Sequence, residues 1–298
     1  MTTDVPNALL KSCQLCPRCC GANRLAGETG FCGAKKEVKV ARASLHHWEE
    51  PCLSGDRGSG TVFFSYCTMR CLYCQNALYD GSKGKDLSPA QLGEVFLDLQ
   101  KQAAHNINLV TPNHYLPQIL EALRFARRKG LTIPAVYNTG GYETAAAIRL
   151  LEGEVSIFLP DLKYYNDTYA QRYSGVSTYF AYAASSIEEM VRQTGPAVFD
   201  QNGMLQKCVI VRHLVLPGLE EDSKKVIAYL YKTFGDDIYI SIMNQYTPLA
   251  RVQNHPELGR LVDPEAYERI VDFALALGVE NGFIQEEGAI GESFIPDF

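Results

Sequence analysis

The chain has 298 residues, 46% of them hydrophobic, and a net charge of −6. This acidic balance provides no basic surface for nucleic acid or for an anionic membrane, so neither is expected as a standing partner. The chain does not open on a secretion-signal pattern, and no stretch approaches the roughly 20 apolar residues of a membrane span, so a cytoplasmic location is expected.

The ten cysteines are spread unevenly along the chain. Five lie between Cys13 and Cys32, and three between Cys67 and Cys74. In a reducing compartment such clustering favours metal or iron–sulfur ligation over a disulfide framework. Cys208 lies in an apolar run and is interpreted as a small buried strand residue, whereas Cys52 remains without an assigned role.

The N-terminal cysteines Cys13, Cys16, Cys20 and Cys32 follow the pattern C-x2-C-x3-C-x11-C, with an additional Cys19 adjacent to Cys20. Four thiolates suit a closed tetrahedral zinc site, and they equally suit an iron–sulfur cluster. Spacing does not separate zinc from an iron–sulfur cluster, but the second cysteine group, Cys67 to Cys74, also suits a cluster and so favours iron–sulfur here. In either case the metal would stabilise a segment too short to form its own core.

A Gly- and Ser-rich segment, residues 54–60, is the one plausible domain boundary. We therefore expect a small cysteine-rich appendage over residues 1–57 and a main domain over residues 58–298.

Beyond residue 60, apolar runs alternate with amphipathic stretches, which predicts an α/β fold built on a parallel sheet or barrel. The expected strands are residues 61–66, 107–110, 133–137, 155–159, 209–216 and 238–243. The first expected helix begins after Ser88, which forms a capping box with Gln91. The other expected helices are residues 116–128, 143–151, 187–193, 222–234 and 264–277. Asn202-Gly203 predicts a tight hairpin turn.

Cys67, Cys71 and Cys74 follow the first expected strand with the spacing C-x3-C-x2-C. Three thiolates on a tight loop can bind three irons of a cubane cluster and leave the fourth iron open to a ligand. The alternative is a zinc site. Zinc sites usually use four ligands in two pairs, and no Cys or His follows Cys74 within the next 30 residues.

Polar residues follow most of the expected strands, where parallel barrels place their active sites. Asp161 and Lys163 are two apart on an extended segment, so both side chains project from one face and could bind one carboxylate-bearing ligand. An exposed ion pair is the alternative. The other such residues are Thr111, Asn113, His114, Asn138, Thr139, Gly140, Gly141, Asn244 and Gln245.

The loop with Tyr73 before its last cysteine resembles that of radical S-adenosylmethionine (SAM) enzymes. Asn76 is similar to a residue of the pyruvate formate-lyase activating enzymes, and the likeness to a branch related to them covers nearly the whole chain. It extends through residues 49–51, 58–60, 212–218 and 296–298. The resemblance implies a partial (β/α)6 TIM-like barrel, a [4Fe-4S] cluster on Cys67, Cys71 and Cys74, and SAM as ligand of the fourth iron.

The resemblance also implies which residues bind SAM, with Tyr73 and Asn76 near the adenosyl group. The expected SAM-binding residues are Tyr73, Asn76, Asn113, Asn138, Thr139, Asp161, Lys163 and Gln245. Two features depart from the family. Neutral Asn138 stands where the activating enzymes carry an Asp of a cation site, and residues 111–114 replace a Gly-Gly-Glu segment that receives the SAM amino group. There the Asn113 amide oxygen, the Thr111 hydroxyl or free backbone carbonyls could accept from the ammonium, whereas His114 is interpreted as a satisfied loop histidine.

By resemblance the chain is expected to be a radical SAM enzyme, an oxidoreductase of the activating-enzyme kind. An electron donor such as flavodoxin or ferredoxin is implied, and the substrate hydrogen would come from a glycine of a partner polypeptide. A radical mutase or dehydrogenase acting on a small molecule would share every motif. A non-catalytic iron–sulfur protein for electron transfer or sensing would need fully ligated clusters, which the open fourth iron disfavours.

Overall fold

The computed structural model describes residues 4–285 except residue 77. Its centre is one sheet with the strand order β10-β9-β8-β6-β5-β4-β2-β1-β3, to which β7 pairs at β8. The strands are β1 (Val38–His46), β2 (Ser59–Phe64), β3 (Lys85–Leu87), β4 (Ile107–Val110), β5 (Ala135–Thr139), β6 (Ile157–Pro160), β7 (Val198–Phe199), β8 (Leu205–Leu214), β9 (Tyr239–Met243) and β10 (Gly282–Ile284).

The strands from β2 to β10 along this order are parallel, whereas β1 and β3 add an antiparallel edge. The six expected strands are all present, and the short strand β10 extends the parallel part beyond them. Within the described residues the sheet stays open between β10 and β3, so the α/β partial-barrel prediction is confirmed.

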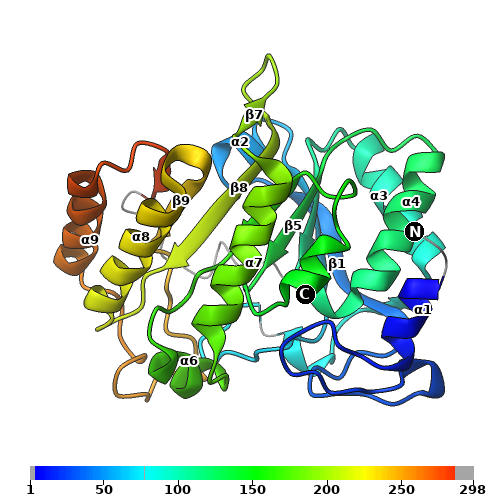
Figure 1. Ribbon diagram of the computed structural model, residues 1–298, viewed down its shortest axis with the longest axis horizontal. Helices are drawn as coiled ribbons and strands as arrows, with labels where there is room; N and C mark the ends of the chain where they lie inside the picture. Colours follow the sequence, from blue (N-terminus) through cyan, green and yellow to red (C-terminus); the bar gives the residue numbers. More distant parts are fainter. Residues whose placement is uncertain (1–3, 77, 286–298) are drawn as a thin grey trace.

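Figure 1 shows α3, α4, α7, α8 and α9 together on one side of the sheet. The helices are α1 (Asp4–Lys11), α2 (Pro51–Ser54), α3 (Pro89–Lys101), α4 (Leu116–Arg128), α5 (Ala145–Arg149), α6 (Asp167–Ser174), α7 (Tyr179–Thr194), α8 (Glu220–Phe234) and α9 (Pro264–Leu277). The Ser88–Gln91 capping box of α3 is present as predicted, with bonds of 2.9 and 3.3 Å. Helix α7 begins at Tyr179 rather than residue 187, and α6 was not predicted.

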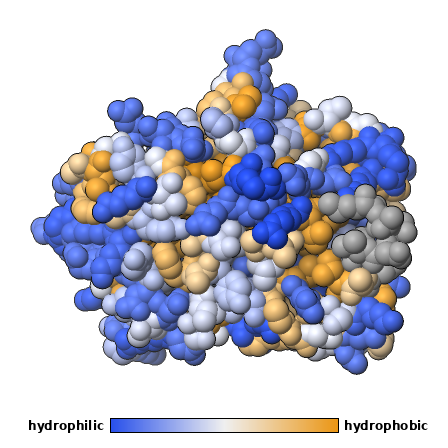
Figure 2. Space-filling model, in the orientation of Figure 1, coloured by the Kyte–Doolittle hydropathy of each residue, from blue (hydrophilic) through white to orange (hydrophobic). Residues whose placement is uncertain are grey.

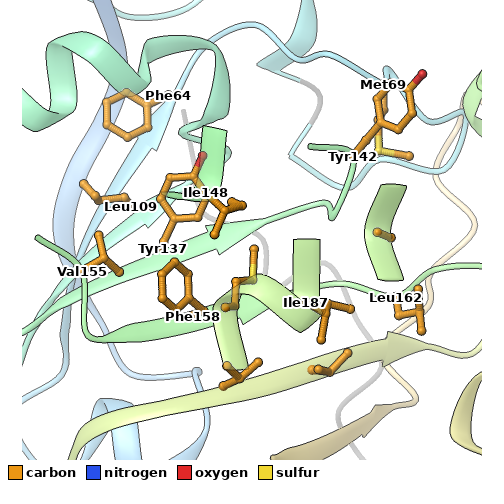
Figure 3. Packing of buried hydrophobic residues seen from close by; sticks show 14 of the residues in the cluster. Phe64, Met69, Leu109, Tyr137, Tyr142, Ile148, Val155, Phe158, Leu162 and Ile187 are labelled. Atoms are coloured by element: carbon orange, nitrogen blue, oxygen red, sulfur yellow. The ribbon is translucent and has the colours of Figure 1, made fainter. Parts of the chain in front are cut away.

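Strand residues alternate between two faces and so build two apolar layers. On the helix side, Phe64, Leu109, Tyr137 and Phe158 come from four neighbouring strands and pack in the main core (Figure 3). On the opposite side a smaller cluster joins Val136, Ile157, Leu159, Leu205, Cys208 and Ile210 to Leu53 of α2. Cys208 is therefore the buried strand residue expected, and this layer closes the inner face below the polar strand ends.

The N-terminal segment joins the main sheet through β1, which pairs with β2 from Val40 to His46. This pairing crosses the boundary expected near residue 57, and the two-part division remains a prediction. In Figure 1 the dark-blue N-terminal loops lie at the lower edge of the sheet, the edge toward which β8 points.

The predicted turn at Asn202-Gly203 connects β7 to β8, and Gly203 takes a φ of 76° that favours glycine. This hairpin projects at the top of Figure 2, where its tip is hydrophilic and hydrophobic atoms lie just below the tip. Among the helices of the described residues, none combines the length and apolarity needed to cross a bilayer. The terminal segment 296–298, part of the family resemblance, lies outside the described residues.

Candidate functional site

A cavity of about 520 Å³ lies at the carboxyl ends of the parallel strands. It is lined by all three cysteines of the C-x3-C-x2-C loop and by all eight residues expected to bind SAM. These are Cys67, Cys71, Cys74, Tyr73, Asn76, Asn113, Asn138, Thr139, Asp161, Lys163 and Gln245. The structure therefore brings the sequence-derived candidates together, because each follows or ends a strand of one parallel sheet.

The cysteine loop is held in a bent conformation. Tyr66 and Arg70, the residues before Cys67 and Cys71, take φ angles of 74° and 62°, which non-glycine residues rarely adopt. Thr111, which follows β4 and lines the same cavity, has a φ of 57°. Such conformations persist where the surroundings impose them, often at functional sites.

Cys71 is buried, and a residue that the sequence did not indicate contacts its sulfur. The hydroxyl of Ser174, at the end of α6, donates to Cys71 Sγ at 2.9 Å. Tyr164 links Ser174 to Tyr73, with its hydroxyl 2.8 Å from Ser174 Oγ and 2.7 Å from the Tyr73 hydroxyl. Burial raises the pKa of the Cys71 thiol to about 12, so the thiolate needs a positive partner such as iron.

Asp161 and Lys163 form an ion pair with 2.5 Å between Lys163 Nζ and Asp161 Oδ2. Their side chains are only 21% and 15% exposed, so the alternative of a freely exposed surface pair is wrong. Burial disfavours the Lys163 ammonium, but the Asp161 carboxylate more than compensates and raises the pKa of Lys163. The cavity thus has a fixed ammonium and a fixed carboxylate on one wall.

Thr139 belongs to a buried group that includes a second unexpected residue, Glu143. Both Thr139 and Tyr137 donate hydroxyl hydrogen bonds to the Glu143 carboxylate. Burial raises the pKa of Glu143 to about 7, while the two hydroxyls act in the opposite direction. Glu143 does not line the cavity but fixes the side chain of Thr139, which does.

Asn113 and His114 bind other protein groups. The Asn113 nitrogen donates to the Thr68 hydroxyl at 3.1 Å, and its oxygen accepts from the His114 backbone nitrogen at 2.9 Å. His114 is buried, and its Nε2 lies 2.8 Å from the Ser65 carbonyl oxygen. The expectation of a satisfied loop histidine is confirmed, and burial lowers the pKa of His114 to about 3. His213 is likewise buried, between Leu162 and Ser223, and does not line the cavity.

The two glycines after β5 have separate roles. Gly141 has a φ of 80°, and a Cβ there would lie 2.3 Å from the Asp161 carbonyl oxygen. A side chain at Gly140 would approach Met69 Sδ to 3.3 Å inside the cavity. The two glycines therefore allow the end of β5 to approach the Asp161 segment closely, because neither carries a side chain.

A charged wall that sequence reasoning did not identify as part of the site lies in the same cavity. Arg212 of β8 pairs with Glu50, with 2.9 Å between Arg212 Nε and Glu50 Oε1, and also with Glu49. Asn108 donates to Glu49 at 2.7 Å. The sequence did contain a signal for this wall, because an arginine inside an otherwise apolar strand needs buried acidic partners.

The N-terminal cysteines surround a second, small cavity. Cys13, Cys16, Cys20 and Cys32 line it together with Arg24, whereas Cys19 does not. Among the described residues, no three Cys, His, Asp or Glu side chains are close enough to bind one ion. This finding does not weigh against a cubane cluster at either site, because its thiolates bind different irons and lie further apart.

The fit of a cluster at Cys67, Cys71 and Cys74 rests on the donor set of this chain. The three thiols line one cavity, Ser174 donates to one of them, and the Lys163 ammonium lies on the same cavity wall. Thiolates stabilised by hydrogen bonds and a nearby cation match the needs of an anionic cluster.

Comparison with known proteins identifies a family for this chain. The model of the radical SAM superfamily matches residues 61–230, which is more than half of the chain. An uncharacterized protein of Methanocaldococcus jannaschii is 27% identical over 284 residues, covering 92% of this chain and 77% of its own.

Two solved structures share the fold. Streptococcus suis SuiB bound to the precursor peptide SuiA has a TM-score of 0.52 at 12% identity over 75% of this chain. The structure titled native anSMEcpe with bound AdoMet and Cp18Cys peptide has a TM-score of 0.50 at 13% identity over 73% of this chain. The match spans 47% of SuiB and 60% of the second structure, so this chain is similar to about half of each.

Proposed function

This chain belongs to the radical SAM superfamily, and from that premise we propose that Cys67, Cys71 and Cys74 bind its [4Fe-4S] cluster and that it acts on a polypeptide. The superfamily consists of enzymes that use such a cluster and SAM. When both are bound, the reduced cluster would donate one electron to SAM, and cleavage of the S–C5′ bond would give methionine and a 5′-deoxyadenosyl radical. The observation that carries the proposal is the convergence of all three cysteines and eight polar residues on one cavity.

In this proposal the polar residues position SAM. The Lys163 ammonium would bind the SAM carboxylate, with Asp161 holding that ammonium in place at 2.5 Å. Asn113 is engaged on both sides by protein groups, so Thr111 and free carbonyls are the better acceptors for the SAM ammonium. Tyr73 and Asn76 would lie near the adenosyl group, and Asn138, Thr139 and Gln245 would complete the contacts.

The substrate we propose is a glycine-containing segment of a partner polypeptide, as in the activating enzymes that the chain resembles. Two proteins of the same fold hold peptides in their structures. The cavity wall of Glu49, Glu50 and Arg212 carries two carboxylates against one guanidinium, and Trp48 beside it is 64% exposed. A net negative wall next to an exposed aromatic ring suits a cationic or polar peptide segment.

Anaerobic reconstitution followed by dithionite and SAM tests the reaction. The native chain should form 5′-deoxyadenosine and methionine, and Cys71→Ala should lose both, because a three-cysteine cluster cannot spare a thiolate. Cys208→Ala is the matched control, since Cys208 is buried in the other layer of the sheet. Cleavage of SAM by the Cys67, Cys71 and Cys74 triple variant would overturn the assignment.

A deuterium-labelled cell extract tests the substrate class. The extract is divided into macromolecular and small-molecule fractions, and each is incubated with the enzyme and SAM. Deuterium in 5′-deoxyadenosine from the macromolecular fraction supports a polypeptide. Transfer only from the small-molecule fraction would instead establish a small-molecule mutase or dehydrogenase.

A further inference from the structure

Four cysteines, Cys13, Cys16, Cys20 and Cys32, line the N-terminal cavity. Cys13, Cys16 and Cys32 are buried, while Cys20 is exposed at the edge. A Cβ on Gly30 would lie 2.3 Å from Cys20 Sγ, so a larger residue there would displace this thiol from its present position. The neighbouring Cys19 bonds to the Cys16 carbonyl instead and stays outside the cavity. Of the two adjacent thiols, only Cys20 therefore lines the cavity.

Arg24 gives an independent sign of an anionic ligand. It is only 2% exposed, and its Nη2 donates to Cys13 Sγ at 3.1 Å and to Cys32 Sγ at 3.8 Å. Its Nε is buried without a hydrogen-bond partner, and no carboxylate of the described residues forms an ion pair with it. A buried cation lining a cavity requires negative charge there. An iron–sulfur cluster supplies thiolates and additional sulfide acceptors, whereas a zinc ion supplies no sulfides.

This cavity and the cavity at the strand ends share one lining residue. Thr68, the residue after Cys67, lines both. Its carbonyl accepts from Arg18 Nε at 2.6 Å on the N-terminal side, and its hydroxyl accepts from Asn113 on the other. Thr68 thus connects the linings of the two cavities through its covalent bond to Cys67 and its hydrogen bonds with Arg18 and Asn113.

The outer side of the N-terminal cavity carries positive charge. Phe31 lines the cavity and is 41% exposed. The guanidinium carbons of Arg18 and Arg70 lie 3.5 and 4.6 Å from the centre of its ring. A surface of this kind attracts an acidic protein.

We propose that Cys13, Cys16, Cys20 and Cys32 bind a redox-active iron–sulfur cluster that relays electrons from an acidic, low-potential one-electron protein donor to the cluster at Cys67, Cys71 and Cys74. This inference rests on the proposed function of that second group. Each transfer moves one electron: the donor is oxidised, the N-terminal cluster is reduced and then reoxidised, and the SAM-binding cluster is reduced. No bond of the protein forms or breaks.

Iron content and electron paramagnetic resonance test the site itself. A chain lacking Cys67, Cys71 and Cys74 should retain about four irons after anaerobic reconstitution and give a cluster signal on reduction. In that background Cys20→Ser should lose the iron and the signal, while the matched Cys19→Ser should keep both. Zinc in place of iron, or equal retention by both variants, would overturn the proposal.

Gly30→Ala provides a second test if Cys20→Ser does not fold. Gly30 has no left-handed φ, so alanine fits the backbone and acts only by displacing the Cys20 sulfur. It should reduce iron content in the triple-variant background. Full iron content in folded Gly30→Ala would contradict ligation by Cys20.

The relay is tested in the full chain by rapid-freeze resonance with two reductants, reduced flavodoxin and dithionite. Cys20→Ser should slow reduction of the SAM-binding cluster by flavodoxin but not by dithionite, which does not depend on the docking surface. Equal slowing or no slowing with both reductants would overturn the relay. Failure of the native chain to cleave SAM with dithionite would instead refute the proposed function.

Discussion

The hydroxyl of Ser174 donates a hydrogen bond to the sulfur of Cys71 at 2.9 Å, which connects the end of α6 to the cysteine loop. The two residues lie 103 positions apart in the chain. Hydrogen bonds to cluster sulfurs are one of the means by which a protein sets a reduction potential, because they stabilise the more negative, reduced state.

Ser174→Ala should therefore make the midpoint potential of the cluster proposed at Cys67, Cys71 and Cys74 more negative. The expected change is of the order of tens of millivolts, since about 59 mV corresponds to a tenfold change for one electron. A redox titration followed by paramagnetic resonance measures it. Iron content should stay unchanged, and Ser174→Thr, which retains the hydroxyl, should restore the potential. An unchanged potential in Ser174→Ala would show that this bond does not act on the cluster.

Lys163→Ala should weaken SAM binding by about one to two decades, because a charge-assisted contact is worth roughly 1.5–3 kcal/mol. Equilibrium binding of SAM to the reconstituted enzyme measures this effect, and iron content should be unaffected. Lys224→Ala is the matched control, because Lys224 pairs with Glu220 on α8 and does not line the cavity. Unaltered binding in both Lys163→Ala and Asp161→Asn would refute their role in binding SAM.

Glu143 should make the protein less stable as pH rises from about 4.5 to 7. Its pKa is about 7 in the folded chain, whereas a carboxyl in an unfolded chain ionises near 4.3. Between these values the folded state binds more protons than the unfolded state, so the free energy of unfolding falls with pH.

Glu143→Gln should remove this fall, which amounts to about 4 kcal/mol. Urea denaturation of both chains at several pH values measures the difference. Glu221→Gln, at an 81% exposed carboxylate on α8, should leave the pH profile nearly unchanged. If the free energy of unfolding changed with pH in the same way for the native chain and for Glu143→Gln, the raised pKa of Glu143 would be contradicted.

Arg212→Met should lower the free energy of unfolding by about 3–5 kcal/mol, because it leaves Glu49 and Glu50 buried without their cation. Arg269→Met should cost less than about 1 kcal/mol, since Arg269 is 50% exposed in its ion pairs with Glu220 and Glu265. Thermal denaturation of the apoproteins compares them. Similar losses for the two variants would mean that the wall is solvated rather than buried.

The sequence alone determined the alternation of strands and helices, because apolar periodicity and capping residues act locally. Helices α4 and α9 begin and end at the expected residues, and Ser88 caps α3 as expected. Boundaries shifted where tertiary contacts compete with local preference, as at the start of α7, whose Tyr179 is buried against the Asp161 segment.

The polar ends of the parallel strands also followed from sequence, because parallel strands in one sheet place their carboxyl ends at one edge. By that rule Cys67, Asn138 and Asp161 form one set of candidates on the sequence alone. Their ligands remain proposals, but their common cavity is a property of the fold.

Only the tertiary structure decided which distant residues complete the site. Ser174 reaches Cys71 from a helix with weak amphipathic pattern, and Glu49 meets Arg212 across 163 positions. The position of Thr68 in the lining of both cavities likewise appears only in three dimensions. The hydrophobic pattern of the sequence predicts which face of a helix or strand is buried. The residues that this face contacts depend on how elements far apart in the chain pack together.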